Sequence, residues 1–311
     1  MIKGIDIGYT YTKDETKNRF KTAFTMDDSI VSGAIRLRVN NETYYVGDGK
    51  GTVELDKAET DINRICLLAD LALCNANDFY IVSGLPVGQF KQQEDKLKNF
   101  ILKQSKSYIS INDQPIRQIT INDVKIFPQG VGALYSQDIK GNVLIVDIGG
   151  RTIDVALIEM QYGKPKLQKN NTWFHGMLVL YSKIVDAVNR KFETTLEPRY
   201  AEDILTKGLE IYSQKQNLDF LKPIIQDHFE EIFTELRLNY PTKTTPIYLC
   251  GGGAQLLFGA FQKRFPDVSI FKEGQFANAI GFYEIGKHHF DKYDNKPENR
   301  RSTVWQIPQN I

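Results

Sequence analysis

The stretch from residue 143 to residue 159 constrains the fold more than any other part of the chain, and it reads VLIVDIGGRTIDVALIE. Its first four apolar residues indicate a buried strand that ends on one carboxylate, Asp147. Two glycines and a threonine follow, and a second apolar run carries its own carboxylate, Asp154. This order predicts two strands joined by a tight glycine turn, which is a β-hairpin.

The turn of this predicted hairpin has the chemistry of a phosphate site. Gly149 and Gly150 leave backbone N–H groups unshielded by side chains, and Thr152 adds a hydroxyl donor. Asp147 is suited to hold, through water, the Mg²⁺ that accompanies phosphates, whereas Asp154 is expected to support the turn. Taken alone, the stretch is at least as typical of an ordinary buried hairpin with a Gly-Gly turn.

A weaker copy of the same pattern begins the chain. Residues 4–8 read GIDIG and residues 145–149 read IVDIG, so each apolar strand is followed by Asp-Ile-Gly with hydroxyl residues close behind. Two such sites at domain spacing predict a duplicated fold whose halves face each other across a nucleotide. Asp6 is then expected to face the same ion as Asp147. The other residues of the first turn expected to contact phosphate are Gly8, Thr10, Thr12 and Lys13.

The composition sets the broad class. With 311 residues, 41% hydrophobic and 25% charged, the chain is long enough for two domains and typical of a soluble globular protein. A net charge of +1 gives no reason to expect nucleic-acid binding, and no apolar run has membrane-spanning length. Three cysteines without a CxxC pair argue for reduced thiols and against a zinc site. A cytoplasmic protein without a signal peptide is therefore expected.

Two further turns add candidate site residues. Gln129 follows Pro128, which ends a predicted strand, and the small residues after it predict a helix. Its neutral amide can orient a water that attacks a γ-phosphate but is a poor general base, so hydrolysis would be slow; a surface helix cap is the simpler alternative. Residues 251–254, GGGA, follow a buried strand and allow the close approach of a flat ligand or of phosphate.

The remaining chain alternates strands and helices around a boundary turn at residues 140–142. No Walker P-loop is present and no Gly-x-Gly-x-x-Gly turn follows the first strand, which disfavours the P-loop and Rossmann classes. The polar tail from residue 287 carries Val304, Trp305 and Ile307, which are candidates to dock it. Helices are predicted over residues 57–75, 89–107, 178–192, 198–213, 218–238 and 276–286.

Five motifs stand in one order along the chain: DIG at residue 6, FPQG at 127, DIGGRTID at 147, GGGA at 251 and FANAIGF at 276. This order resembles the phosphate 1, connect 1, phosphate 2, adenosine and connect 2 signature of the actin, heat-shock ATPase and sugar kinase superfamily. Within it, the chain resembles the actin-like ATPases of the ParM/StbA plasmid-segregation family, on stretches such as VSGLPV at 82 and EPRYAEDILTKGLE at 197.

The resemblance implies an actin-like α/β fold with two ribonuclease-H-like domains that face a nucleotide cleft. The first domain would cover residues 1–140, completed by a C-terminal helix at about residues 276–311. The second would cover residues 141–275. ATP or GTP would bind together with Mg²⁺, and Gln129 and Asp147 would be the catalytic residues.

The resemblance also extends the set of expected binding residues. Asp6 and Asp147 would hold the metal, and Glu202 and Lys207 lie in the segment that lines the adenine and ribose side of the cleft in relatives. The expected nucleotide contacts are Asp6, Gly8, Tyr9, Thr10, Thr12, Lys13, Gly149, Gly150, Arg151, Thr152, Glu202, Lys207, Gly251, Gly252, Gly253 and Ala254. The departures from relatives are the bulky Tyr9 and Tyr11 of the first turn, and Arg151, which would either pair with phosphate or face solvent.

The function that the resemblance implies is ATP-dependent polymerisation into filaments that segregate plasmid DNA, with slow hydrolysis controlling filament stability. The partners would be further copies of the chain and a DNA-binding adaptor of ParR type on a centromere-like site. Direct contact with nucleic acid is not expected. Such a protein would be encoded by a bacterial plasmid or phage and act in the cytoplasm.

Two other classes fit the nucleotide motifs. One is an ATPase of the same superfamily that does not polymerise, either a small-molecule kinase or a chaperone-like protein. Sugar kinases usually have a longer chain with an acidic base in the substrate cleft, and chaperones add a substrate-binding domain. The other is a nucleotide-binding assembly or pilus-type protein that does not hydrolyse its ligand.

Overall fold

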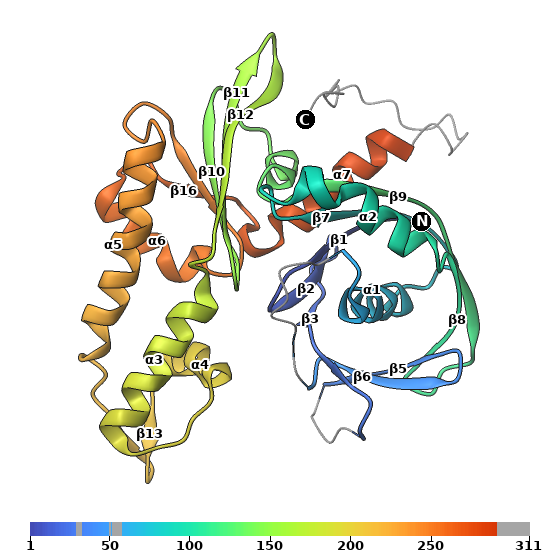
Figure 1. The fold of residues 1–311 in the computed structure, drawn as a ribbon, viewed down its shortest axis with the longest axis horizontal. Helices are drawn as coiled ribbons and strands as arrows, with labels where there is room; N and C mark the ends of the chain where they lie inside the picture. The colour runs from blue at the N-terminus through green and yellow to red at the C-terminus, as the bar shows by residue number, and fades with distance from the viewer. Residues whose placement is uncertain (29–32, 50, 52–57, 291–311) are drawn as a thin grey trace.

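Two β-sheets, each covered by helices, make up the protein in a computed structural model that describes residues 1–28, 33–49, 51 and 58–290 (Figure 1). The first sheet has nine strands in the order β3-β2-β1-β7-β9-β8-β5-β6-β4. Its strands are β1 (Ile2–Ile7), β2 (Tyr11–Asp14), β3 (Arg19–Lys21), β4 (Phe24–Thr25), β5 (Ile35–Val39), β6 (Glu42–Val46), β7 (Asp78–Leu85), β8 (Lys106–Ile111) and β9 (Arg117–Pro128).

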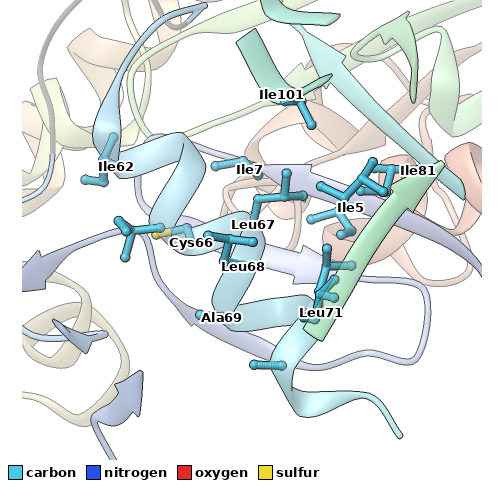
Figure 2. Packing of buried hydrophobic residues seen from close by; sticks show 14 of the residues in the cluster. Ile5, Ile7, Ile62, Cys66, Leu67, Leu68, Ala69, Leu71, Ile81 and Ile101 are labelled. Carbon is cyan, nitrogen blue, oxygen red and sulfur yellow. The ribbon is translucent and has the colours of Figure 1, made fainter. Parts of the chain in front are cut away.

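Two helices, α1 (Asp61–Leu73) and α2 (Phe90–Leu102), pack against the first sheet. Helix α1 begins at Thr60, whose side chain accepts a hydrogen bond from the Asn63 N–H. The strands curl around α1 in Figure 1, and Figure 2 shows its apolar side chains against Ile5, Ile7 and Ile81 of the central strands. The apolar runs of β1 and β7 therefore form the core that holds the end of β1 in place.

The second sheet has five strands in the order β12-β11-β10-β15-β16, and a two-stranded hairpin lies apart from it. The strands of the second sheet are β10 (Val143–Ile148), β11 (Ile153–Gln161), β12 (Lys164–Trp173), β15 (Ile247–Cys250) and β16 (Ser269–Ile270). The separate hairpin consists of β13 (Glu210–Ile211) and β14 (Gln214–Lys215). Its helices are α3 (Met177–Phe192), α4 (Ala201–Lys207), α5 (Leu221–Asn239) and α6 (Ala254–Arg264). Three short 3₁₀ helices complete the described elements: η1 (Gly132–Ser136), η2 (Pro198–Tyr200) and η3 (Gly274–Phe276).

The two sheets share one strand pattern. Strand β1 pairs antiparallel with β2 and parallel with β7, and β10 pairs antiparallel with β11 and parallel with β15. The next strands also correspond, because β3 and β12 extend the antiparallel side while β9 and β16 extend the parallel side. The duplication predicted from the two Asp-Ile-Gly sites is thus a duplication of strand order and direction.

The last described helix, α7 (Ala277–Phe290), returns to the first half of the chain, where it packs against β1, β7 and η1 (Figure 1, in red). Glycines allow the contact to be close. A Cβ atom at Gly4 would overlap the backbone of α7, and one at Gly281 would overlap the Gly132 carbonyl. Helix α7 therefore packs tightly on the first half of the chain, against β1 and η1.

The structure departs from the sequence prediction in three elements. The helix predicted over residues 89–107 ends at Leu102, and strand β8 begins at Lys106. The helix predicted over residues 198–213 ends at Lys207, because Gly208 adopts a left-handed conformation with φ of 89° and the chain continues into the β13–β14 hairpin. Gln129 does not open a helix; Gly130, with φ of 77°, turns the chain, and only the short 3₁₀ helix η1 follows. The helix expected at about residues 276–311 to complete the first domain is described up to residue 290 as α7, and the rest of that range lies outside the described residues, as do the docking residues Val304, Trp305 and Ile307.

No helix in the described part of the chain combines the length and the apolar character that crossing a membrane requires.

Candidate functional site

A pocket lies between the β1–β2 and β10–β11 hairpins, where the two halves of the duplicated fold meet. The pocket contains most of the residues that the sequence analysis selected. Residues from the loop after β15, from α3 and from α4 close its other sides. Its lining consists of Asp6, Gly8, Tyr9, Thr10, Tyr11, Lys13, Arg19, Gln129, Asp147, Gly149, Gly150, Thr152, Asp154, Met177, Tyr181, Glu202, Gly251, Gly252, Gly253 and Gln275.

Equivalent positions of the two hairpins carry the two carboxylates expected to hold a metal. Asp6 lies opposite Lys13 in the β1–β2 pairing, and Asp147 lies opposite Asp154 in the β10–β11 pairing. Both Asp6 and Asp147 are almost fully buried, with exposed fractions of 4% and 6%. They lie at the carboxyl ends of buried strands, the usual place for a ligand in an α/β sheet.

Asp6 is held by two partners from its own half of the molecule. Its Oδ1 accepts a hydrogen bond of 2.6 Å from the Gln129 Nε2, and its Oδ2 lies 3.6 Å from the Lys13 Nζ. Gln129 is 7% exposed and also lines the pocket. Gln129 and Asp6 are thus joined directly, although they are 123 residues apart in the chain.

Asp147 is held by a residue that the sequence analysis did not select. The Nδ2 of Asn278, on α7, donates a hydrogen bond of 2.5 Å to the Asp147 Oδ2, and the Asn278 Oδ1 accepts one of 2.9 Å from the Gly130 N–H. Asn278 belongs to the FANAIGF motif, so the motif was recognised while its asparagine was not. No spacing rule marks a single asparagine as a partner of a carboxylate 131 residues away.

The two hairpin turns have the same backbone geometry. The Gly8 N–H donates to the Tyr11 carbonyl at 3.0 Å, and the Gly149 N–H donates to the Thr152 carbonyl at 2.9 Å. The tips meet, because a Cβ at Gly150 would overlap the Thr10 hydroxyl. That hydroxyl is buried and has no hydrogen-bond partner among the described residues. A buried polar atom in this position is expected to find its partner on a ligand.

Asp154 connects the second hairpin to the first half. Its Oδ1 accepts hydrogen bonds from the Val87 N–H at 3.1 Å and the Thr172 hydroxyl at 2.5 Å, and its Oδ2 accepts one from the Thr152 hydroxyl at 3.0 Å. Burial and the neighbouring Asp147 raise the pKa of Asp154 to about 7. The bond from Thr152 is the turn-supporting contact expected of Asp154, and the bond from Val87 extends that support across the two halves.

The three glycines after β15 bring the backbone directly against Asp147. Gly251 has φ of 85°, and a side chain there would overlap the Asp147 Oδ1 and the Ile148 carbonyl. A Cβ at Gly253 would overlap Ile148 and Met177, whereas Gly252 faces open space. Only glycine satisfies both the left-handed conformation and the close approach at position 251.

Three contacts join the halves at the mouth of the pocket. The Tyr11 hydroxyl donates to the Glu202 Oε2 at 3.2 Å, and the Arg19 Nη1 donates to the Gln275 Oε1 at 3.0 Å. The Lys17 Nζ lies 2.8 Å from the Glu273 Oε1. Burial and Glu202 raise the pKa of Tyr11, so its hydroxyl stays protonated and can donate at neutral pH.

Four of the expected nucleotide contacts do not line this pocket. Thr12 is fully buried and shares a hydrogen bond with Thr22. Arg151 lies over the Tyr9 ring, 5.5 Å from its centroid, and Lys207 is exposed and paired with Asp203 at 2.8 Å. Ala254 is buried at the start of α6. Besides Asn278, the residues around the pocket that the analysis did not select as nucleotide contacts are Tyr11, Arg19, Asp154, Met177, Tyr181 and Gln275.

The donor set fits Mg²⁺ only together with a phosphate ligand. Asp6 and Asp147 line the pocket from equivalent strand ends, and the described residues contain no group of three or more His, Cys, Asp or Glu side chains placed to hold a metal. Mg²⁺ typically binds one or two carboxylates and completes its shell with waters and substrate phosphates. Asp6, Asp147 and the glycine turns match that arrangement.

Models of two actin-related families match the sequence in succession. Residues 4–132 match the N-terminal domain of actin-like proteins, and residues 145–263 match the C-terminal part of the archaeal MreB-like actin homologue family. No curated protein sequence gives a significant match.

Solved structures of actin homologues share the fold over nearly their whole length. A 15-stranded ParM filament from Clostridium botulinum has a TM-score of 0.78 at 21% identity, covering 92% of this chain and 99% of that one. The archaeal actin homologue Ta0583 has a TM-score of 0.80 at 21% identity, covering 93% and 99%. Its complex with ADP has a TM-score of 0.77 at 20% identity, with the same coverage.

The actin-like α/β fold predicted from the sequence is therefore confirmed. The duplicated strand order, the pocket between equivalent hairpins and the two matching models lead to one conclusion: in an actin-like fold, the chain joins an N-terminal domain of actin-like proteins to a C-terminal domain of the archaeal MreB-like actin homologue family.

Proposed function

We propose that the protein is an ATP-dependent, filament-forming actin-like protein that segregates plasmid DNA. The observation that carries the proposal is the pocket in which Asp6 and Asp147 approach each other from equivalent strand ends, beside two glycine turns and Gln129. The ADP complex of Ta0583 supports nucleotide binding, and the ParM filament supports self-assembly. In this proposal, residues 1–140 with α7 and residues 141–275 act as two domains that close on ATP or GTP.

Each group of the pocket has a task in nucleotide hydrolysis. The glycine turns and the Thr10 hydroxyl would bind phosphate oxygens, Lys13 would neutralise phosphate charge, and Asp6 and Asp147 would hold Mg²⁺. The bound Mg²⁺ would supply charge stabilisation to the phosphates. Glu202, which also lines the pocket, would offer an acceptor to a ribose hydroxyl.

Gln129 orients the attacking water. Because its Nε2 donates to Asp6, the amide is fixed, and its oxygen is the group suited to accept a hydrogen bond from water. An amide is a weak base, so this arrangement positions the water without strongly activating it. Hydrolysis is then slow relative to assembly and controls how long a filament persists. A ParR-type adaptor on a centromere-like site would connect the filament to the plasmid.

Sedimentation and electron microscopy of the purified chain with ATP, with GTP and without nucleotide test this proposal. We expect polymer only with nucleotide, together with slow phosphate release. Asp147→Ala should weaken binding of the magnesium nucleotide. Gln129→Ala should still bind and assemble, but should hydrolyse about a hundredfold more slowly and give longer-lived filaments. Nucleotide hydrolysis without polymer at any protein concentration would instead indicate a non-polymerising ATPase.

A further inference from the structure

Asn278 is placed where the two halves of the pocket meet, yet it does not line the pocket. It is the second residue of α7 and is 4% exposed. Both ends of its amide are used: the Nδ2 donates to Asp147, and the Oδ1 accepts from the Gly130 N–H. The opposite orientation of the amide would bring its oxygen against the carboxylate, so the carboxylate determines which way the amide points.

A continuous chain of contacts results. The Asp6 carboxylate accepts a hydrogen bond from the Gln129 side chain, and Gly130 follows Gln129 in the sequence. The Gly130 N–H donates a hydrogen bond to Asn278, and the Asn278 side chain donates one to Asp147. The chain connects the two carboxylates proposed to hold metal and passes through the residue proposed to orient water. Gln129 itself is fixed at its backbone, where its N–H donates to the Leu85 carbonyl at 2.7 Å.

The helix that carries Asn278 is held firmly. Gly281 lies against the Gly132 carbonyl, and Phe282 packs on Gly84 and Gly132, next to the turn that contains Gly130. Phe282 is fully buried. The asparagine therefore comes from a rigid support, as a side chain must if it is to hold another group in one orientation.

We propose that Asn278 is a positioning residue of the nucleotide site: it orients the Asp147 carboxylate toward Mg²⁺ and fixes the Gly130 turn that carries Gln129. The inference rests on the proposed function, because it needs a nucleotide and its metal at this site. Partners that hydrogen-bond to metal-binding groups commonly change metal affinity 10- to 100-fold when they are removed. A merely structural asparagine would affect stability without changing the response to Mg²⁺.

The test measures binding of a fluorescent ATP analogue to the full chain, once with excess Mg²⁺ and once with EDTA. In EDTA, the affinity of Asn278→Ala for the analogue should lie within about twofold of the wild-type affinity. With excess Mg²⁺, the affinity of the variant should be about 10- to 100-fold lower than that of wild type. Asn278→Ser, which is too short to span both contacts, should give the same result and serves if the alanine variant fails to fold. The matched control is Asn63→Ala, which removes a buried asparagine of α1 outside the pocket.

A double-mutant cycle tests the link to Gln129. The double variant Gln129→Ala/Asn278→Ala should hydrolyse nucleotide more slowly than wild type, but by a factor clearly smaller than the product of the two single-variant factors. The effects are not independent because both residues act on one chain of contacts. Equal loss of affinity with Mg²⁺ and with EDTA, or no loss in either, would overturn the positioning role while leaving the proposed function intact. A wild-type chain that binds no nucleotide would overturn both.

Discussion

At the scale of single residues, the most unusual feature is a buried lysine among carboxylates. Lys3 is fully buried on β1, and its Nζ lies 2.7 Å from Asp14, 3.2 Å from Glu15 and 3.5 Å from Asp70. Burial lowers the pKa of Lys3, but Asp70, Glu15 and Asp14 outweigh burial and raise it overall. The ammonium group therefore stays charged and balances acidic groups that connect β1, the start of the following hairpin and α1.

Removal of this ammonium should be costly. We expect Lys3→Ala to lower the free energy of unfolding by about 3–5 kcal/mol, because it leaves buried carboxylates without a counter-charge. Urea denaturation measures the loss. The control is Lys98→Ala, which removes a half-exposed partner of Asp123 and should cost no more than about 1 kcal/mol. Similar losses in the two variants would contradict the view that burial makes the Lys3 cluster special.

The same cluster predicts a pH dependence of stability. Burial, Asp14 and Glu15 raise the pKa of Asp70 to about 7, although Lys3 acts in the opposite direction. In the unfolded chain, an aspartate has a pKa of about 3.9. The folded state thus binds this proton more tightly, so the contribution of Asp70 to stability is full below about pH 4 and is lost as the pH rises toward about 7.

Asp70→Asn should flatten that loss. Relative to wild type, the variant should gain stability steadily between about pH 4 and pH 7, as measured by urea midpoints. The pKa of Asp154 is also raised to about 7, so Asp154 makes the free energy of unfolding fall over the same pH range. The variant retains this fall. If the free energies of unfolding of the variant and wild type differ by the same amount across this range, Asp70 already ionises near its unfolded pKa in the folded protein.

At the scale of elements, the hairpins and the glycine turn could be predicted from the sequence because their signals are local. An apolar strand, a carboxylate and a glycine turn occupy adjacent positions in residues 143–159 and again in residues 2–14. The contacts that complete the pocket are not local. Tyr11 meets Glu202 across 191 positions, and only the folded chain brings such residues together.

Local signals also failed in particular places. The periodicity of residues 198–213 is helical, but Gly208 ends α4 and a hairpin follows. Thr12 follows the hydroxyl pattern of the first turn, yet it sits on β2 with its side chain turned into the core. A shift of one residue reverses the face of a strand, so a motif defines a turn more securely than it defines which side chains reach the ligand.

Helix α7 predicts opposite outcomes for two glycine substitutions. Gly281→Ala should lower the free energy of unfolding by about 1–3 kcal/mol, because the new methyl group overlaps the Gly132 carbonyl. The control, Gly259→Ala in the interior of α6, meets no described atom within 4 Å and should raise stability by up to about 1 kcal/mol. Thermal unfolding of both variants decides; equal effects would contradict a close α7 contact.

At the scale of the whole molecule, the arrangement of the halves depends on contacts at both sides of the pocket. Helix α7 and the Asp154–Val87 bond lie at the inner side, and the contacts made by Tyr11, Arg19 and Lys17 lie at the mouth. The mouth contacts are few and partly exposed, so each contributes little. The halves are thus expected to open and close about the inner side.

Tyr11→Phe should shift this balance toward an open form. Loss of the hydrogen bond to Glu202 should destabilise the closed arrangement relative to the open one by about 0.5–1.5 kcal/mol. Small-angle scattering without nucleotide should then report a larger radius of gyration for the variant. The control is Tyr45→Phe, which removes a comparable bond from a tyrosine to Asp28 within the first half. An unchanged radius in Tyr11→Phe would show that other contacts keep the pocket closed.

The return of α7 to the first half has a consequence for how the protein is made. A ribosome delivers β1 first and α7 only after the whole second half, yet Gly4 on β1 is built to contact α7 directly. The first half cannot complete its packing until α7 has been made. A nascent chain that stops after β16 would leave the surfaces of β1 and η1 that contact α7 uncovered. Translation must therefore reach the end of α7 before the first half can take its final form.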